Sequence, residues 1–192
     1  MIGMTMFKSK TRRRSFAKNR SGSAAVEFAI VVPVFLATMF SIFEVGWFYY
    51  VGSIVDASVT DGARMLRTGQ IQKSSGTPDD KFDLLYDDIC NVLDTFGDCQ
   101  TRLTVESKVY ATFADLAADT TPPTCADAPP ADLDAIPFEP GAELEIVRVR
   151  ICYIYTTINP AIGVNLSEPS TNQRRLISTM IFRNEPYEKN TI

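Results

Sequence analysis

The chain has 192 residues, about the length of one domain, and its charge is distributed unevenly. Residues 1–22 carry seven basic side chains and no acidic one. The other 12 Lys and Arg stand against 23 Asp and Glu, so residues 23–192 have a formal charge of −11. An acidic body argues against nucleic-acid binding, because phosphate binding needs clustered cations. The absence of histidine excludes His-dependent hydrolases and His-containing metal sites.

The basic leader, residues 1–22, is followed by an apolar run that predicts a transmembrane helix over residues 23–51. Sixteen uncharged residues separate Glu27 from Glu44, and eleven more precede Asp56. A bilayer-spanning helix needs about 20 predominantly apolar residues. Aromatic residues at 47–50 fit the far interface of a membrane. The positive flank predicts a cytoplasmic N-terminus and an exported body.

Two other interpretations of this apolar run are possible. One is the buried helix of a soluble core, which the basic flank and the aromatic cluster disfavour. The other is a secretory signal peptide, whose apolar region has roughly 7–15 residues and ends at a small-residue cleavage site. Here the run is longer, and aromatic residues occupy the place of that site. We therefore expect the span to be retained.

Helical periodicity continues beyond the membrane over residues 52–70. Val55, Val59, Gly62 and Leu66 recur at helical spacing and form an apolar stripe. Gly69 is a suitable helix stop. Residues 23–68 are therefore predicted to form one helix, roughly 70 Å long at ~1.5 Å per residue.

The body, residues 71–192, is predicted to be an exported α+β domain. A second, short helix is expected over Asp79–Leu93, and β-branched and aromatic residues predict strands. The predicted strands are Arg102–Phe113, Glu143–Thr157 and Arg174–Phe182. Six prolines within residues 119–141 predict an irregular surface loop. We expect an antiparallel sheet packed against the long N-terminal helix.

Four cysteines lie in the body, and no C-x-x-C pair occurs among them. An even number in an exported segment favours two disulfides over reduced core cysteines. Three pairings are possible, and we favour Cys90–Cys99 with Cys125–Cys152. The first closes a short loop, and the second ties the proline-rich loop to a strand.

The boundary between leader and span reads R-S-G-S-A-A-V-E-F and has the form of a prepilin peptidase substrate. Cleavage would fall between Gly22 and Ser23 on the cytoplasmic side, with Phe28 completing the motif. Glycine lets the backbone enter a narrow protease site in extended form. Cleavage leaves an α-amino group on Ser23 and a carboxylate, Glu27, at the fifth mature position.

Two interpretations of Glu27 are open. A carboxylate at the edge of the hydrocarbon is costly unless paired, and the Ser23 amine of a neighbouring subunit would supply a partner that sets register in a filament. Alternatively, Glu27 only starts the helix, where an acidic side chain is favourable.

The segment from Arg20 to Arg67 resembles the signature region of the TadE-like family of Tad pilus systems. That family shows an R-x-G-x-A-A-V-E-F opening, a proline partway along the span, an E-x-G near its end and a G-A-R after it. The corresponding residues are Arg20, Gly22, Ala24, Ala25, Val26, Glu27, Phe28, Pro33, Glu44, Gly46, Gly62, Ala63 and Arg64. The segment FRNEPY, residues 182–187, also resembles the end of TadE-type proteins.

The resemblance implies a minor pilin or pseudopilin in the bacterial inner membrane, with a periplasmic domain, that is processed by a prepilin peptidase. Its partners would be other pseudopilins, the major Flp-type pilin and the inner-membrane Tad platform, in pilus assembly, adhesion and biofilm formation. It could also enter the pilus.

Five residues are candidates for a role in assembly: Glu27, Pro33, Glu44, Gly62 and Arg64. Pro33 either lets the helix bend or is simply tolerated in lipid. Glu44 is expected at the outer interface or against a partner's cation. Gly62 either offers a small surface for close helix packing or only follows helical spacing.

The rival interpretation is an uncleaved, signal-anchored membrane protein whose exported domain binds a partner. An enzyme is not expected, because no histidine, phosphate loop or nucleophile elbow occurs. The acidic pairs Asp79-Asp80 and Asp87-Asp88 lack the pattern of a calcium loop. No catalytic residue, metal, cofactor or small-molecule substrate is predicted.

Overall fold

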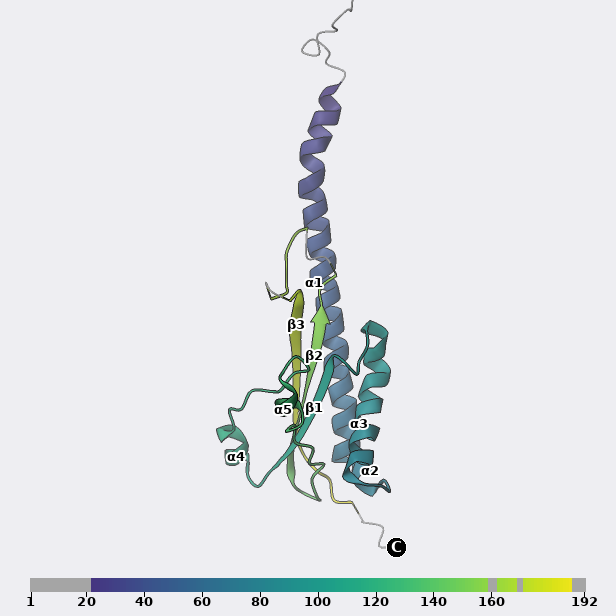
Figure 1. Ribbon diagram of the computed structural model, residues 1–192, viewed down its shortest axis with the longest axis vertical. Helices are drawn as coiled ribbons and strands as arrows, with labels where there is room; N and C mark the ends of the chain where they lie inside the picture. The colour runs from purple at the N-terminus through teal and green to yellow at the C-terminus, as the bar shows by residue number, and fades with distance from the viewer. Residues whose placement is uncertain (1–21, 159–161, 169–170, 188–192) are drawn as a thin grey trace, which may run out of the picture.

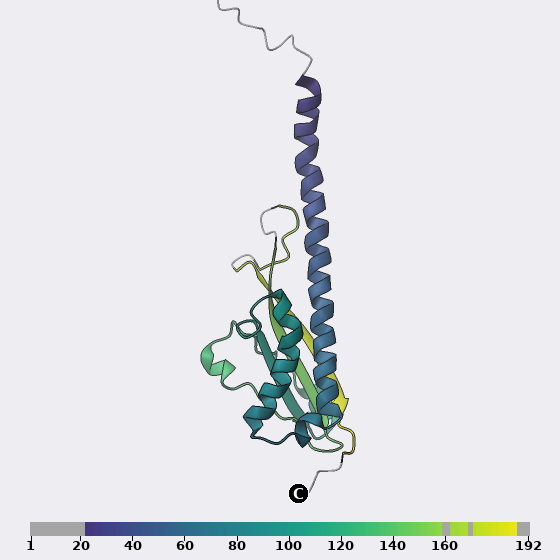
Figure 2. The ribbon, with the colours of Figure 1, turned by 90° about the vertical axis from the view of Figure 1, so that its right-hand side faces the viewer.

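The computed structural model describes residues 22–158, 162–168 and 171–187. The predicted leader, apart from Gly22, lies outside the described residues. A long helix, α1 (Ser23–Arg67), extends well beyond a small domain that packs against its second half (Figures 1 and 2). The predicted fold class, an α+β domain on a long N-terminal helix, is confirmed.

Helix α1 has 45 residues, about 67 Å at ~1.5 Å per residue, and it continues through Pro33. It ends where the sequence predicts a stop. Gly69 has a φ of 75°, a left-handed conformation that favours glycine. A Cβ atom at this position would lie 2.6 Å from the ring of Tyr187, so only glycine fits.

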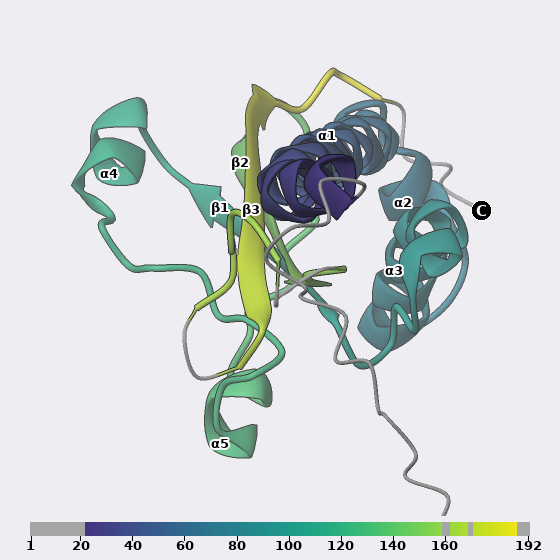
Figure 3. The ribbon, with the colours of Figure 1, turned by 90° about the horizontal axis from the view of Figure 1, so that it is seen from above.

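Two further helices follow, α2 (Gln70–Lys73) and α3 (Pro78–Leu93), and then the 3₁₀ turn η3 (Asp94–Phe96). Helix α3 begins one residue earlier than predicted, because Thr77 and Asp80 form a capping box and Pro78 occupies the first turn. Its Leu85 and Ile89 are buried in the core shared with α1. Together, α1 and α3 cover one face of the sheet (Figure 3).

The sheet has three antiparallel strands in the order β1 (Leu103–Tyr110), β2 (Ile146–Thr156) and β3 (Gln173–Arg183). All three were predicted, with ends that differ by up to three residues. The central strand β2 is buried at every position except Thr156. Its odd-numbered residues from Val147 to Tyr155 enter the core with α1 and α3.

The segment between β1 and β2 covers the second face of the sheet. It contains the short helices α4 (Phe113–Ala118) and α5 (Pro130–Leu133), which lie on the side opposite α1 in Figure 3. The sequence predicts an irregular surface loop here, and most of the segment is irregular. However, it packs on the sheet, because the Cys125–Cys152 disulfide ties it to β2.

Both disulfides join the cysteines paired in the sequence analysis. The Cα atoms are 5.6 Å apart in Cys90–Cys99 and 5.3 Å apart in Cys125–Cys152. The first links the end of α3 to the turn before β1, and the second links the proline-rich segment to β2. The two bonds therefore fix the connections on either side of β1, from α3 to β1 and from β1 to β2.

Candidate functional site: the two halves of the long helix

The first half of α1, residues 23–43, projects beyond the sheet and α3, and most of its large apolar side chains are exposed. The large exposed hydrophobic residues of this half are Val26, Phe28, Ile30, Val31, Val34, Phe35, Ile42 and Phe43. Among the described residues, α1 is the one helix long and apolar enough to cross a membrane. Exposure of such a surface to water is unfavourable, so we expect lipid or another protein to cover it.

The predicted processing residues lie at the start of this half. Helix α1 begins at Ser23, immediately after Gly22, and no side chain caps its N-terminus. The Ser23 hydroxyl donates a hydrogen bond to Glu27 Oε1 over 3.1 Å. Gly22, Ser23, Glu27 and Phe28 are all exposed. The proposed cleavage site therefore lies at an accessible helix boundary.

Glu44 marks the change from the first half to the second, and its side chain is only 3% exposed. The hydroxyl of Tyr155 donates to Glu44 Oε1 over 3.0 Å, and the amide of Ile158 lies 3.2 Å from Oε2. Burial, followed by the hydrogen bond to Glu44, raises the pKa of Tyr155, so the phenol remains a donor. The sequence predicts an interfacial or intermolecular role for Glu44, whereas the structure gives this carboxylate partners in its own chain.

The other three predicted assembly residues differ in whether they contact the domain. Gly62 is buried, and a Cβ atom there would approach Leu85 Cδ1 to 3.0 Å and Ile89 Cδ1 to 3.2 Å. The close helix packing expected for Gly62 is thus made with α3 of the same chain. Arg64 is exposed on α1, as is Pro33 nearer the N-terminus.

The final described segment, residues 182–187, fastens the end of α1 to the domain. Glu185 bonds to Arg67 twice, through its amide to the Arg67 carbonyl and through an ion pair of 2.9 Å. The Tyr187 hydroxyl donates to the carbonyl of Gly141, and the Asn184 side chain donates to the carbonyls of Pro140 and Ala142. The FRNEPY segment therefore has a structural role, because it connects the end of α1 to the loop that precedes β2.

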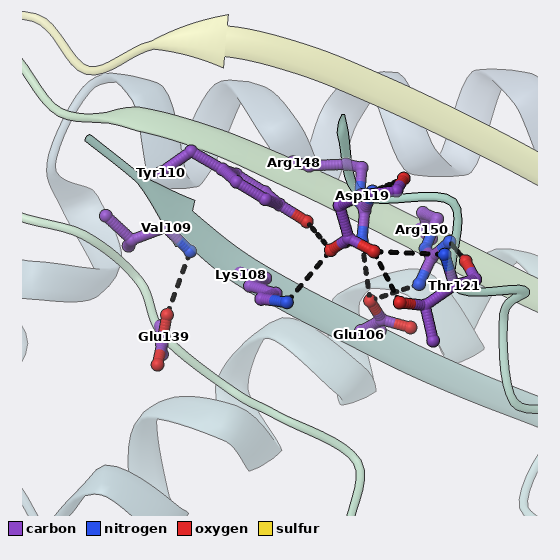
Figure 4. Close-up of polar contacts among 9 residues, drawn as sticks. All are labelled: Glu106, Lys108, Val109, Tyr110, Asp119, Thr121, Glu139, Arg148 and Arg150. Carbon is purple, nitrogen blue, oxygen red and sulfur yellow. Dashed lines mark hydrogen bonds and ion pairs between the residues drawn. The ribbon is translucent and has the colours of Figure 1, made fainter. Parts of the chain in front are cut away.

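A buried ionic cluster lies on the sheet face away from α1 (Figure 4). Glu106 on β1 pairs with Arg150 at 2.5 Å and with Arg148 at 3.4 Å, both on β2. Asp119, from the proline-rich segment, pairs with Arg148 at 3.1 Å and with Lys108 at 2.9 Å. Thr121 and Tyr110 also donate hydrogen bonds to Asp119. The cluster thus joins the segment to two strands.

These contacts shift two pKa values. Hydrogen bonds from Lys108, Thr121 and Tyr110 hold the pKa of Asp119 well below its usual range. Burial, followed by the hydrogen bond to Asp119, raises the pKa of Tyr110 to about 12. Both groups therefore keep the protonation state that the cluster needs across the physiological range. Buried charges of this kind hold a conformation together only while all partners are present.

Metal sites and ligand pockets have requirements that the described residues meet only in part. In the described part of the chain, no group of three or more Cys, Asp and Glu side chains is placed to hold a metal ion. A groove of about 860 Å³ lies between α3, β1 and the proline-rich segment, with Phe82, Tyr86, Val105, Ile136 and Phe138 among its lining residues. Its lining is mainly apolar, with few convergent polar groups.

Two sets of contacts were not predicted from the sequence. The bonds from Tyr155 and Ile158 to Glu44 join positions more than 100 residues apart. The ionic cluster had a partial signal, because Arg148 and Arg150 alternate with apolar residues on β2 and Glu106 lies on another predicted strand. What the sequence could not supply was the register, which places Glu106 opposite Arg150.

Comparison with known proteins gives one match. Residues 22–64 match the family model described as TadE-like protein. No curated protein and no solved structure matches the chain. The matched range begins at the proposed cleavage site, spans the bare half of α1 and ends in the half that packs on the domain. The resemblance predicted from the sequence is thereby confirmed, and residues 22–64 are a TadE-like segment.

Proposed function

We propose that this chain is a minor pilin or pseudopilin of the Tad (tight adherence) pilus machinery, processed by a prepilin peptidase after Gly22. The observation that carries the proposal is the TadE-like match over residues 22–64, on a helix whose first half is apolar and bare. The family associates the chain with the pilus machinery and the membrane. Its partners in assembly are then other pseudopilins, the major Flp-type pilin and the inner-membrane platform.

The proposed topology divides the chain into four parts. Residues 1–22 are the cytoplasmic leader, 23–51 the transmembrane helix, 52–70 its extramembrane continuation, and 71–192 the periplasmic domain. Export is supported by the two disulfides, which form in oxidising compartments. A reporter that is active only outside the cytoplasm, fused after Ile192, should therefore be active. Activity of a cytoplasm-specific reporter at the same position would overturn this orientation.

Mass spectrometry of the N-terminus in membrane extracts tests processing. The proposal expects a mature chain that begins at Ser23. Gly22→Leu should leave the leader attached and abolish pilus production, because a bulky side chain obstructs the extended backbone in the peptidase site. Gly52→Leu is the matched control, since position 52 lies outside the signature residues and a Cβ atom there meets nothing within 4 Å; it should leave processing unchanged. Cleavage of the Gly22→Leu chain at the same bond would contradict the proposed site.

The second candidate function is an uncleaved, signal-anchored protein with an exported binding domain. The apolar groove between α3 and β1 favours it, because a binding domain needs such a concave surface. The N-terminus separates the two candidates. An intact leader on the functional protein supports the anchor, whereas a chain that begins at Ser23 supports the pseudopilin.

A further inference from the structure

The described parts of the connection between β2 and β3, residues 157–158 and 162–168, lie along α1 beyond the end of the sheet (Figures 1 and 2). Two described contacts fix it there. The amide of Val164 donates to Ser41 Oγ over 2.9 Å, and the amide of Ile158 donates to Glu44. Gly163 lies closer to the N-terminal end of α1, because a Cβ atom built on it would be 2.7 Å from the carbonyl oxygen of Ala37. The connection thus reaches the level of Ala37 on the helix.

Helix geometry places that level inside the proposed span. A hydrocarbon layer of about 30 Å is crossed by about 20 helical residues. A layer that begins near Ala24 therefore ends near Phe43. Ala37 is then roughly 9 Å inside the outer boundary, at ~1.5 Å per residue.

The composition of the connection suits that environment. No charged residue occurs between Thr156 and Ser167, although loops in water are normally polar. Ile158 is 63% exposed, Ile162 46% and Val164 48%. These side chains extend the bare apolar surface of α1 rather than forming a separate patch on the domain. We call Ile158 together with residues 162–166 the hairpin tip.

The boundary of the apolar region is also consistent. Glu44, the first charged residue after the hydrocarbon part of the span (residues 24–43), is buried beneath Tyr155 and Ile158 instead of facing outward. Aromatic residues follow it at Trp47, Tyr49 and Tyr50, all exposed. Such residues favour the interfacial region of a membrane. Charge returns to the connection at Glu168, beyond the hairpin tip.

We propose that the hairpin tip inserts into the outer leaflet of the same bilayer that α1 spans, with Ile158, Ile162 and Val164 in contact with lipid acyl chains. This inference rests on the proposed membrane span. Segments that lie in the interface bury their apolar side chains about 5–10 Å deep, which matches the depth of the tip. Backbone groups need partners there, and Ser41 and Glu44 supply them to Val164 and Ile158. The periplasmic domain thereby has a second attachment to the membrane.

Tryptophan quenching by brominated lipids tests the insertion in the full chain. The only tryptophan, Trp47, is first replaced by phenylalanine. Single tryptophans are then placed at Val164→Trp, at Phe35→Trp on the bare half of α1, and at Phe113→Trp on α4. Each chain is reconstituted in vesicles of phosphatidylethanolamine and phosphatidylglycerol, with or without bromine on the acyl chains. Peptide mapping of both disulfides verifies folding, and Ile162→Trp replaces Val164→Trp if that variant misfolds.

Bromine should quench Val164→Trp at least about half as strongly as Phe35→Trp, because side chains at this depth meet acyl chains. Phe113→Trp should be unaffected. Quenching at 35 without quenching at 164 would overturn the insertion and leave the anchor intact. If position 164 were also shielded from aqueous iodide, a second protein chain would cover the tip, which likewise overturns lipid contact. Loss of quenching at both positions would overturn the insertion together with the membrane span.

Discussion

Residues 23–43 and residues 44–67 belong to one uninterrupted helix, yet they meet different surroundings. The first half is mostly apolar and largely exposed, and it meets the rest of the chain through the β2–β3 connection at Ala37 and Ser41. The second half is amphipathic, with Val51, Val55 and Leu66 fully or almost fully buried. The change occurs within one turn, at Glu44. One helix therefore combines two kinds of surface: the first half is apolar enough to cross a membrane, and the second half forms the core of the domain together with α3 and the sheet.

The strongest test of this division is Glu27→Ala. We expect it to abolish piliation while leaving processing at least partly intact, because the mature Ser23 amine of a neighbouring subunit would lose its countercharge in a low-dielectric setting. The domain should be unaffected, since Glu27 accepts its hydrogen bond within the described part of the chain from Ser23, one turn away on α1 and outside the domain. Pilus yield and thermal unfolding of the full chain in micelles measure the two effects.

Glu27→Asp is the matched control for reach, because it keeps the charge and shortens the side chain by one methylene. Partial piliation with this variant would support an intermolecular ion pair. Full piliation with Glu27→Ala would show that the carboxylate only starts the helix, and the pairing would have to be abandoned.

The next effect concerns the domain half alone. Replacing Cys125 and Cys152 by serine should lower the free energy of unfolding by about 3–4 kcal/mol, and replacing Cys90 and Cys99 by ~1 kcal/mol less. The difference follows from the closed loops, which separate the cysteines by 27 and 9 residues. Urea unfolding of the full chain in micelles measures both losses. Equal losses would contradict the loop-length argument, and detachment from the micelle would contradict the independence of the bare half.

Different features of the sequence predict the two halves of α1. Composition alone predicts the membrane-spanning half, because an uncharged apolar run of this length is typical of a transmembrane helix. The stripe from Val55 to Leu66 predicts the buried face, and β-branched runs predict the three strands. The order of the strands and the cover over the second face could not be predicted. They depend on contacts such as Cys125–Cys152 and Glu106–Arg150, which join distant positions.

Glu44 shows most clearly where sequence reasoning stops. A carboxylate after an apolar run fits an interfacial position, and nothing local indicates a partner. Its neighbours in space come from the far end of β2, more than 100 residues away, so burial and pairing follow only from the packed domain. For Gly62 the pattern left close helix packing and plain helical spacing both open, and it did not indicate that α3 of the same chain packs against this glycine.

Glu44→Ala should destabilise the domain by about 1–3 kcal/mol, because the buried Tyr155 hydroxyl and the Ile158 amide would lose their acceptor. Glu44→Gln retains one carbonyl oxygen and should cost less. The shift in the urea midpoint of the full chain gives both values. Glu27→Gln, the equivalent change in the bare half, is the control and should not move the midpoint. A stable Glu44→Ala domain with lost piliation would restore the intermolecular role predicted from the sequence.

Two glycines in the second half of α1 should respond in opposite directions to alanine. At Gly62 a Cβ atom approaches Leu85 and Ile89 at 3.0–3.2 Å, so Gly62→Ala should cost roughly 1 kcal/mol or more by overpacking. At Gly52 a Cβ atom meets nothing within 4 Å, so Gly52→Ala should stabilise the helix by up to about 1 kcal/mol. Midpoints of thermal unfolding compare the two. Equal shifts would show that α3 moves aside at no cost.

The smallest effect is a pH dependence that only the domain should show, arising from the cluster around Asp119. The folded-state pKa of Asp119 lies below its usual 3.8, so its contribution to stability is complete above that value and is lost as the pH falls below it. Tyr110 is the opposite case, with a pKa raised from 10.0 to about 12, so its contribution is complete below pH 10 and is lost as the pH rises towards 12. Asp119→Asn should flatten the acid limb of a stability profile measured by urea unfolding, and Tyr110→Phe the alkaline limb. If either variant kept the pH dependence of the parent protein, Glu106, Arg148 and Arg150 would hold the proline-rich segment without the replaced side chain. Attachment of α1 to the micelle should persist at both low and high pH.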